Sequence, residues 1–217
     1  MIVVDRSGSV AKILLGKRHR RHVFMPSKFV FPGGGIDASD AAMPVAAPLH
    51  PEVETRLMRR VERPGPDLAR GLALAAVRET VEETGLMLGV RRKFDWLALT
   101  GAWAEFAATD IQPDLSRMHL IARAITPPGF PRRFDARFFA IDADAVADRK
   151  DGVVHADAEL VELAWLPLHE ARQLGMPIIT EIVLDEFEKR VRAGFGRNLP
   201  VPFYYTDEEE CFVRDFL

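Results

Sequence analysis

The stretch that decides the fold is a short acidic run near the middle of the chain. It reads Arg78-Glu79-Thr80-Val81-Glu82-Glu83-Thr84-Gly85-Leu86. Glu79 is three and four residues away from Glu82 and Glu83, so a helix places all three carboxylates within about one turn. Like charges at these spacings destabilise an isolated helix by about 0.2–0.5 kcal/mol per pair. A divalent cation such as Mg²⁺ or Mn²⁺ removes this repulsion, but a solvated acidic face has the same spacing.

The helix that carries this run is predicted from Asp67 to Thr84. Asp67 is a suitable N-cap, and Gly85 is a suitable residue just past the C-terminus. At 100° per residue the apolar positions form one face and the glutamates lie opposite. The apolar face consists of Leu74, Val77 and Val81.

A glycine run precedes this helix in the chain. The predicted strand Lys28–Phe31 is stopped by Pro32 and by the adjacent Gly33, Gly34 and Gly35. Three glycines leave the backbone free for left-handed geometry and for close approach to a ligand. An ordinary turn has the same composition.

Residues 41–70 separate the glycine run from the helix and have a different composition. We predict one helix here, from Glu52 to Val61, and interpret the segment as an insertion that is too short to bury a core of its own. Its prolines are Pro44, Pro48, Pro51, Pro64 and Pro66.

The remaining pattern predicts an α/β (α+β) sandwich with a mixed sheet, in one domain spanning residues 1–217. A hairpin joins Ile2–Asp5 to Val10–Leu15, and a late amphipathic helix runs from Ile178 to Val191. Further strands are predicted at Trp96–Phe106, Leu120–Thr126, Ala136–Ile141 and Leu160–Trp165.

Composition excludes several classes of protein. A formal charge of −3 over 217 residues gives no reason to expect a nucleic-acid partner. The lone Cys211 excludes an internal disulfide. No apolar stretch is long enough for a signal peptide or a membrane span, so we expect a cytoplasmic protein without a membrane partner.

The acidic run resembles the Nudix box, Arg-Glu-U-x-Glu-Glu-x-Gly-U, in which U is bulky and aliphatic. Thr80 departs from the aliphatic position, although its methyl group can still pack. The box opens with Gly-x5-Glu, which Gly34 to Asp40 resembles with aspartate in place of glutamate. Arg78 stands 30 positions later than in an uninterrupted box, at 78 instead of 48. The box is therefore split by the segment at 41–70.

This resemblance implies a loop–helix–loop motif in an α/β/α sandwich and hydrolysis of a phosphoanhydride bond in a small nucleoside diphosphate derivative. It implies that Glu79, Glu82 and Glu83 bind Mg²⁺ or Mn²⁺, with the carbonyl of Gly34 as a further ligand. Gly33 and Gly34 approach the substrate, and Arg78 orients Glu79. The general base is left open between a box glutamate and two loop acids, Asp157 and Glu159, for which an ordinary solvated acid is the alternative interpretation.

The split box and the segment Thr126–Asp135 resemble one Nudix subgroup, which includes diphosphatases of coenzyme A and acyl-coenzyme A. That likeness implies that Arg132 or Arg133 contacts substrate phosphate, although Arg133 and Asp135 could instead brace a strand. ADP-ribose and NADH are alternative substrates, and a nucleotide-sensing module without catalysis is a remote alternative. The isomerase branch of the family needs an active-site cysteine, which Cys211 is too distant in sequence to supply. A homodimer is left open.

Overall fold

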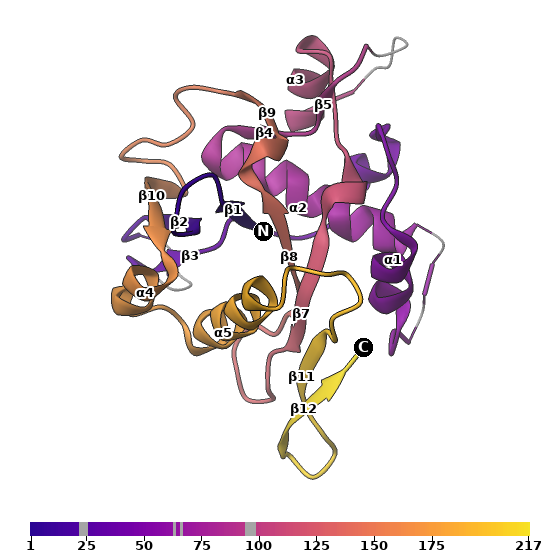
Figure 1. Ribbon diagram of the computed structural model, residues 1–217, viewed down its shortest axis with the longest axis vertical. Coiled ribbons are helices and arrows are strands. Elements are labelled where there is room, and N and C mark those ends of the chain that lie inside the picture. The colour runs from indigo at the N-terminus through magenta and orange to yellow at the C-terminus, as the bar shows by residue number, and fades with distance from the viewer. Residues whose placement is uncertain (22–25, 63, 66, 94–98) are drawn as a thin grey trace.

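The computed structural model of the protein describes residues 1–21, 26–62, 64–65, 67–93 and 99–217. Its main feature is an eight-stranded sheet with the strand order β10-β2-β1-β8-β7-β11-β12, in which β3 also pairs with β2 (Figure 1). Two neighbouring pairs, β1–β8 and β7–β11, are parallel and the others are antiparallel, so the sheet is mixed as predicted. The strands are β1 (Ile2–Asp5), β2 (Lys12–Arg18), β3 (Phe29–Val30), β7 (His119–Ile125), β8 (Asp135–Asp142), β10 (Leu160–Pro167), β11 (Pro202–Thr206) and β12 (Phe212–Phe216).

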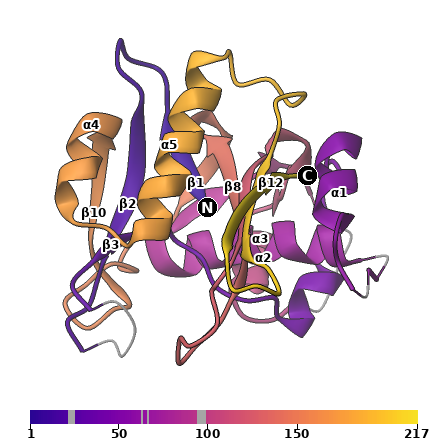
Figure 2. The same ribbon diagram turned by 90° about the horizontal axis from the view of Figure 1, so that it is seen from below.

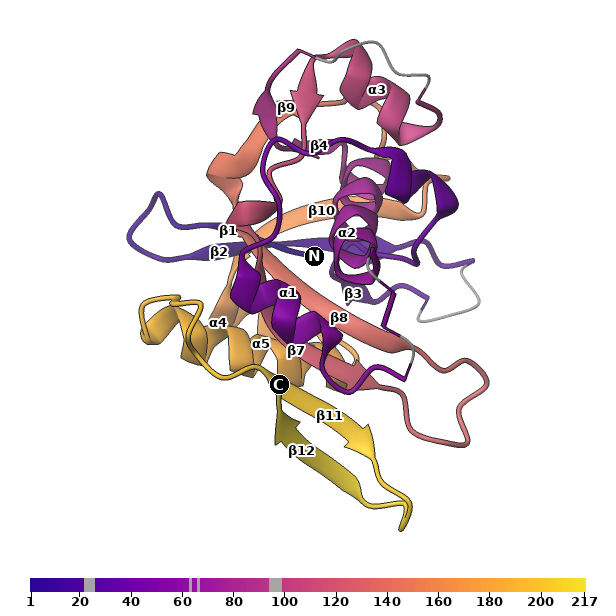
Figure 3. The same ribbon diagram turned by 90° about the vertical axis from the view of Figure 1, so that its right-hand side faces the viewer.

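Helices cover both faces of this sheet. One layer contains α1 (Pro51–Met58), α2 (Leu68–Thr84) and α3 (Ala102–Ala108), and the other contains α4 (Leu168–Ala171) and α5 (Ile178–Arg192). The helices α4 and α5 lie side by side (Figures 1 and 2). Figure 3 shows α2 and α5 on opposite sides of the strands. Two small ladders pair β4 (Leu86–Leu88) with β9 (Val146–Arg149) and β5 (Val90–Arg91) with β6 (Ile111–Gln112). Short 3₁₀ turns span Ala38–Ala42, Leu115–Arg117, Ala143–Ala145 and Arg172–Leu174.

The two layers follow from the alternation of side chains along the strands. Successive residues of a strand point to opposite faces. In β1, Val3 joins the buried cluster that contains α2, whereas Ile2 and Val4 join the cluster that contains α5. A strand that is apolar on both sides therefore lies in the middle of the sheet, between two helix layers.

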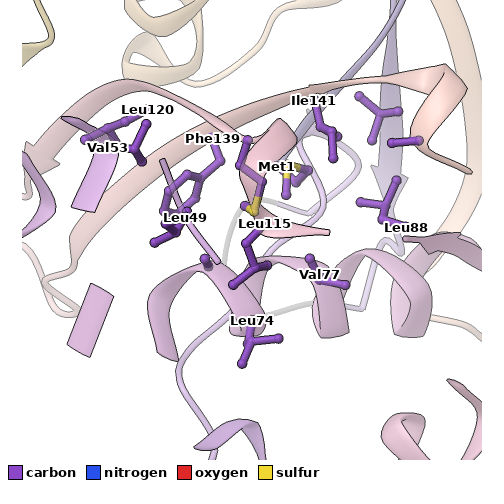
Figure 4. Close-up of a cluster of buried hydrophobic side chains, with 14 of the residues drawn as sticks. Met1, Leu49, Val53, Leu74, Val77, Leu88, Leu115, Leu120, Phe139 and Ile141 are labelled. Carbon is purple, nitrogen blue, oxygen red and sulfur yellow. The ribbon is translucent and has the colours of Figure 1, made fainter. Parts of the chain in front are cut away.

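The inserted segment shares the core of the α2 layer. Met43, Val53 and Leu57 are fully or almost fully buried, in the same cluster as Leu74 and Val77 of α2. Figure 4 shows Val53 of α1 in one cluster with side chains of α2 and of the sheet. The prediction that the segment cannot form its own core fits this packing. Its helix is shorter than predicted: α1 ends at Met58, and Arg60 adopts a left-handed φ of 52°.

One predicted strand is wrong in the part that the structure describes. The range Trp96–Phe106 was expected to be extended, but Ala102–Ala108 forms helix α3. Residues 96–98 of that range lie outside the described residues. Ala102, Trp103 and Phe106 are its buried side chains, a spacing that fits one face of a helix and does not alternate as a strand requires.

The termini of α2 lie where they were predicted, but only the C-terminus is capped in the predicted way. Asp67 is the N-cap, but its side chain makes no capping hydrogen bond. Gly85 ends the helix with φ 77°, and its amide donates to the carbonyl of Val81 over 2.8 Å. None of the described helices is long and apolar enough to cross a membrane.

Candidate active site

Arg78 is the centre of the site. It is almost completely buried in α2, and its guanidinium donates four hydrogen bonds of 2.7–2.9 Å. Its Nε donates to Asp40, Nη2 donates to the carbonyl of Gly35, and Nη1 donates to both Glu79 and Glu82. Burial alone would lower the pKa of Arg78, but the hydrogen bonds to Asp40 and Glu79 outweigh it and raise that pKa above its ordinary value. Arg78 therefore joins the glycine loop to the acidic helix as a permanent cation, as its predicted orienting role requires.

Asp40 anchors this arginine from the other half of the split box. Its carboxylate is fully buried and accepts from Arg78, from the backbone amide of Asp37 and from Trp103 Nε1. The Trp103 bond measures 3.1 Å and comes from α3. The aspartate that replaces the expected glutamate is thus fully supplied with donors. No local pattern pointed to Trp103, because its partner lies 63 residues away in the chain.

The glycine loop packs directly against the glutamates. The amide of Gly33 donates to Glu83 Oε2 over 3.0 Å. A Cβ atom at Gly34 would lie 2.4 Å from the carboxylate carbon of Glu79, a distance that real side chains do not adopt. A Cβ at Gly35 would meet nothing within 4 Å. The structure therefore brings Gly33 and Gly34 against the acidic helix, where a side chain at position 34 would displace the carboxylate of Glu79.

The three glutamates differ in their surroundings. Glu83 is 8% exposed, and burial raises its pKa to about 8, helped by the nearby carboxylate of Glu159 and opposed by the Gly33 amide. Burial also raises the pKa of Glu79, against the hydrogen bond from Arg78. The Glu82 side chain is 43% exposed. The helix face opposite Leu74 is thus only partly solvated, and it is not the fully solvated acidic face that the same spacing would also allow.

Of the two loop acids that the sequence left open, the structure ties Glu159 to this cluster. It lies just before β10, its carboxylate acts on both Glu79 and Glu83, and it pairs with Arg18 at the end of β2. Asp157 lies in the same loop and shares a cavity of about 410 Å³ with Glu159 and His19. Of the two loop acids that the sequence left open, Glu159 is therefore the better placed.

These residues suit a hard divalent cation by their chemistry. The carboxyl groups of Glu79, Glu82 and Glu83, with Glu159 nearby, supply the oxygen ligands that Mg²⁺ and Mn²⁺ prefer. No three acidic, histidine or cysteine side chains in the described part of the chain already form a complete cage for a metal ion. Glu79 and Glu82 face Arg78, and Glu83 faces the Gly33 amide. Binding an ion requires rotation of these side chains.

The structure places the predicted arginine pair on the loop that joins β7 to β8. Arg132 and Arg133 are exposed in the loop between β7 and β8, and Arg133 Nε donates to the carbonyl of Thr126 over 3.0 Å. No contact between this pair and the acidic helix is seen among the described residues. The expected brace by Asp135 exists, but its partners are Arg123 and Arg137 and not Arg133.

Comparisons with known proteins show a similarity to Nudix hydrolases in both structure and sequence. A crystal structure of a Nudix hydrolase from Alicyclobacillus acidocaldarius matches with a TM-score of 0.59 and 29% identity, over 85% of this chain and 86% of the other. A Caenorhabditis elegans protein whose name places it among the nudix hydrolases (nudix hydrolase 7) is 25% identical over 167 residues. That match covers 71% of this chain but 46% of the relative, so the chain spans about half the length of that curated protein. No family model matches.

The fold is thus that of a Nudix α/β/α sandwich, with the acidic helix and the glycine loop in contact as the box requires. In fold and in sequence the chain is therefore similar to Nudix hydrolases.

Proposed function

We propose that the chain hydrolyses a phosphoanhydride bond in a nucleoside diphosphate linked to another group, with coenzyme A or an acyl-coenzyme A as substrate. The observation that carries the reaction class is the contact between the two halves of the split box: Gly33 binds Glu83, and Arg78 binds both Asp40 and Glu79. The coenzyme A assignment rests on the likeness of the split box and of residues 126–135 to that subgroup.

In this proposal Glu79, Glu82 and Glu83 would hold Mg²⁺ or Mn²⁺, with the carbonyl of Gly34 as a further ligand. A bound divalent ion would neutralise the diphosphate and lower the pKa of a water molecule. Arg78 keeps Glu79 and Glu82 in place through its bonds to both carboxylates. The close packing of Gly34 on Glu79 brings the backbone to the site without a side chain in the way.

The chemical step needs one proton acceptor beside the glutamates. The water oxygen forms a bond to one phosphorus, the anhydride P–O bond breaks, and the departing phosphate keeps the electron pair. We assign the released proton to Glu159, because its carboxylate lies outside the helix and raises the pKa of both Glu79 and Glu83. Such base catalysis contributes about 10²–10⁴-fold to a rate. Asp157, which has no such link among the described residues, serves as the matched control.

Mass spectrometry of the products tests the proposal. The protein with Mg²⁺ is incubated with coenzyme A, acetyl-coenzyme A, ADP-ribose and NADH. Formation of 3′,5′-ADP and a phosphopantetheine species is the expected result. Release of AMP and a sugar phosphate without cleavage of coenzyme A would show that the substrate is a different nucleoside diphosphate derivative. The proposed reaction class would then still hold. Nucleotide binding without cleavage of any of the four would instead identify a sensing module.

A further inference from the structure

Arg137 of β8 is a buried cation on the same face of the sheet as α2. Side chains alternate along a strand, so Arg137 shares its face with Phe139 and Ile141, which pack in the cluster of α2. The Arg137 side chain is 8% exposed. Burial lowers its pKa, against the attraction of Asp135. A guanidinium this well buried normally has its charge matched by a partner.

Its charge is only half matched. Arg137 lies opposite Arg123 of β7, and both arginines pair with the single carboxylate of Asp135. Arg123 takes both oxygens, through Nε and Nη2 over 2.8 Å each. Arg137 reaches one of these oxygens through Nη1, also over 2.8 Å. Two cations thus share one anion, which leaves a net positive charge on this part of the sheet.

Arg137 also has hydrogen-bond donors to spare. Its Nη1 donates to the carboxylate and the carbonyl of Asp135, but Nε is buried and has no hydrogen bond to any of the described residues. In Arg123, by contrast, all three nitrogens are used, since Nη1 donates to the carbonyls of Arg59 and Arg60. An unsatisfied buried donor is costly, and more so when it carries charge. A negatively charged acceptor would satisfy this free donor and also match the excess charge of Arg137.

The register of the sheet places Arg137 near the glycine loop. Ile2 of β1 lies beside Ala140, so Met1 lies beside Phe139, and Met1 N donates to the carbonyl of Pro32 over 2.6 Å. Pro32 precedes Gly33, which binds Glu83. Arg137 is two residues beyond Phe139 on the same face, about 7 Å further along the strand. A nucleotide held at the glutamates can extend over this distance.

We propose that Arg137 binds a phosphate group of the substrate, on the α2 face of the sheet and beside the glycine loop. This inference rests on the proposed function, since it takes the nucleoside diphosphate substrate from there. A planar guanidinium fixed by Asp135 presents its free donors to phosphate oxygens in one orientation. Arg133 does not offer this, because it is exposed and its Nε is occupied by a backbone carbonyl.

Calorimetric titration with product nucleotides tests this site without catalysis. Wild type, Arg137→Gln, Arg137→Lys and Arg133→Gln are titrated with 3′,5′-ADP and with AMP, in EDTA so that the acidic helix holds no metal ion. We expect Arg137→Gln to bind 3′,5′-ADP about tenfold more weakly or worse, while Arg133→Gln binds as wild type does. Arg137→Lys keeps the charge beside Asp135 and should bind with intermediate strength, which also covers the case in which Arg137→Gln does not fold.

The pair of nucleotides locates the phosphate. A larger loss for 3′,5′-ADP than for AMP assigns Arg137 to the 3′-phosphate, and equal losses assign it to the 5′-phosphate that both share. Unchanged affinity in Arg137→Gln and Arg137→Lys, or a loss in Arg133→Gln alone, would overturn the inference. If wild type cleaves no diphosphate but its nucleotide binding still depends on Arg137, the phosphate site is supported and the proposed function is refuted.

Discussion

At the scale of single residues, the site depends on buried charges that hold one another in place. Arg78 bonds to Asp40, Glu79, Glu82 and the carbonyl of Gly35, so one guanidinium fixes both halves of a box that 30 extra residues separate. Aspartate at position 40 is shorter than the glutamate that the family pattern has, and Trp103 supplies an additional donor to it. The local sequence predicted the glutamates and offered Glu159 as one of two loop acids, but it could not show Trp103 or Arg137, whose roles arise from contacts between distant segments.

The glutamates themselves give the first prediction. Glu82→Gln and Glu83→Gln should each lower kcat by about a hundredfold or more, because metal-assisted charge stabilisation is worth several kcal/mol and ~1.4 kcal/mol is tenfold. The fold should survive, since in Glu83→Gln the new side-chain amide keeps an oxygen that can accept from Gly33. Steady-state kinetics and thermal melts check both points, with Glu162→Gln on β10 as an exposed acidic control. Near-normal turnover in both box variants would refute the metal-site assignment.

The second prediction concerns the glycine loop. Gly34→Ala places a methyl group where the Glu79 carboxylate lies, so either Glu79 or the loop must move. We expect kcat to fall more than tenfold, since misplacement of a reacting group by about 1 Å can cost a hundredfold. Gly35→Ala is the matched control, because its methyl group would meet nothing within 4 Å. Equal activity of the two variants would show that the contact with Glu79 does not matter.

At the scale of elements, α2 was the best predicted part of the chain and α3 the worst. The caps and the apolar positions of α2 agree with its observed span, because a long amphipathic helix repeats its signal over many residues. The helix α3 has seven residues rich in alanine beside two aromatic side chains, and the aromatic content favoured a strand. The hairpin β11–β12 was not predicted, although Figures 1 and 3 show it extending from the body of the molecule.

The end of α2 gives the third prediction. Gly85 has φ 77°, and a Cβ there would lie 2.2 Å from the carbonyl oxygen of Lys150. Gly85→Ala should therefore cost the left-handed penalty of about 1–2 kcal/mol and a steric clash besides. Gly152 has a similar φ of 76° and nothing within 4 Å of its Cβ, so Gly152→Ala measures the backbone penalty alone. Denaturant unfolding should show Gly85→Ala clearly less stable than Gly152→Ala, and equal losses would mean that the clash is relieved.

At the scale of the whole molecule, the sequence predicted the mixed sheet and its two helix layers but not the contacts that close the structure. A strand that is buried on both faces, such as β1, can be predicted from its continuous run of apolar residues. Hydrogen bonds between residues that are distant in the sequence cannot be predicted from the local pattern. Arg190 of α5, for example, donates to the carbonyls of Gly196 and Pro200, and Arg56 of the inserted segment donates to that of Leu199. The insertion is thereby tied to the C-terminal loop.

The last prediction is that stability falls in acid because one buried histidine becomes protonated on unfolding. His119 of β7 is 9% exposed, its Nδ1 has no hydrogen bond among the described residues, and its ring packs on Phe195 with centroids 4.3 Å apart. Burial lowers the pKa of His119 to about 4, and the cations of Arg197 and Arg190 contribute to this lowering. The groups that act on the imidazole are Arg6, Arg190, Arg197 and one opposing carboxylate, Asp142.

Because the folded-state pKa lies below the unfolded value of 6.5, the unfolded chain binds the extra proton between these two pH values. The contribution of His119 is therefore fully present above pH 6.5 and decreases as the pH falls toward 4. We expect the free energy of unfolding to drop by roughly 1–2 kcal/mol between about pH 7 and pH 5 from this group. His119→Gln should flatten that part of the profile, whereas His169→Gln, which removes an exposed histidine, should leave it unchanged. Denaturant unfolding at several pH values measures both, and parallel profiles for wild type and His119→Gln would show that other groups cause the loss.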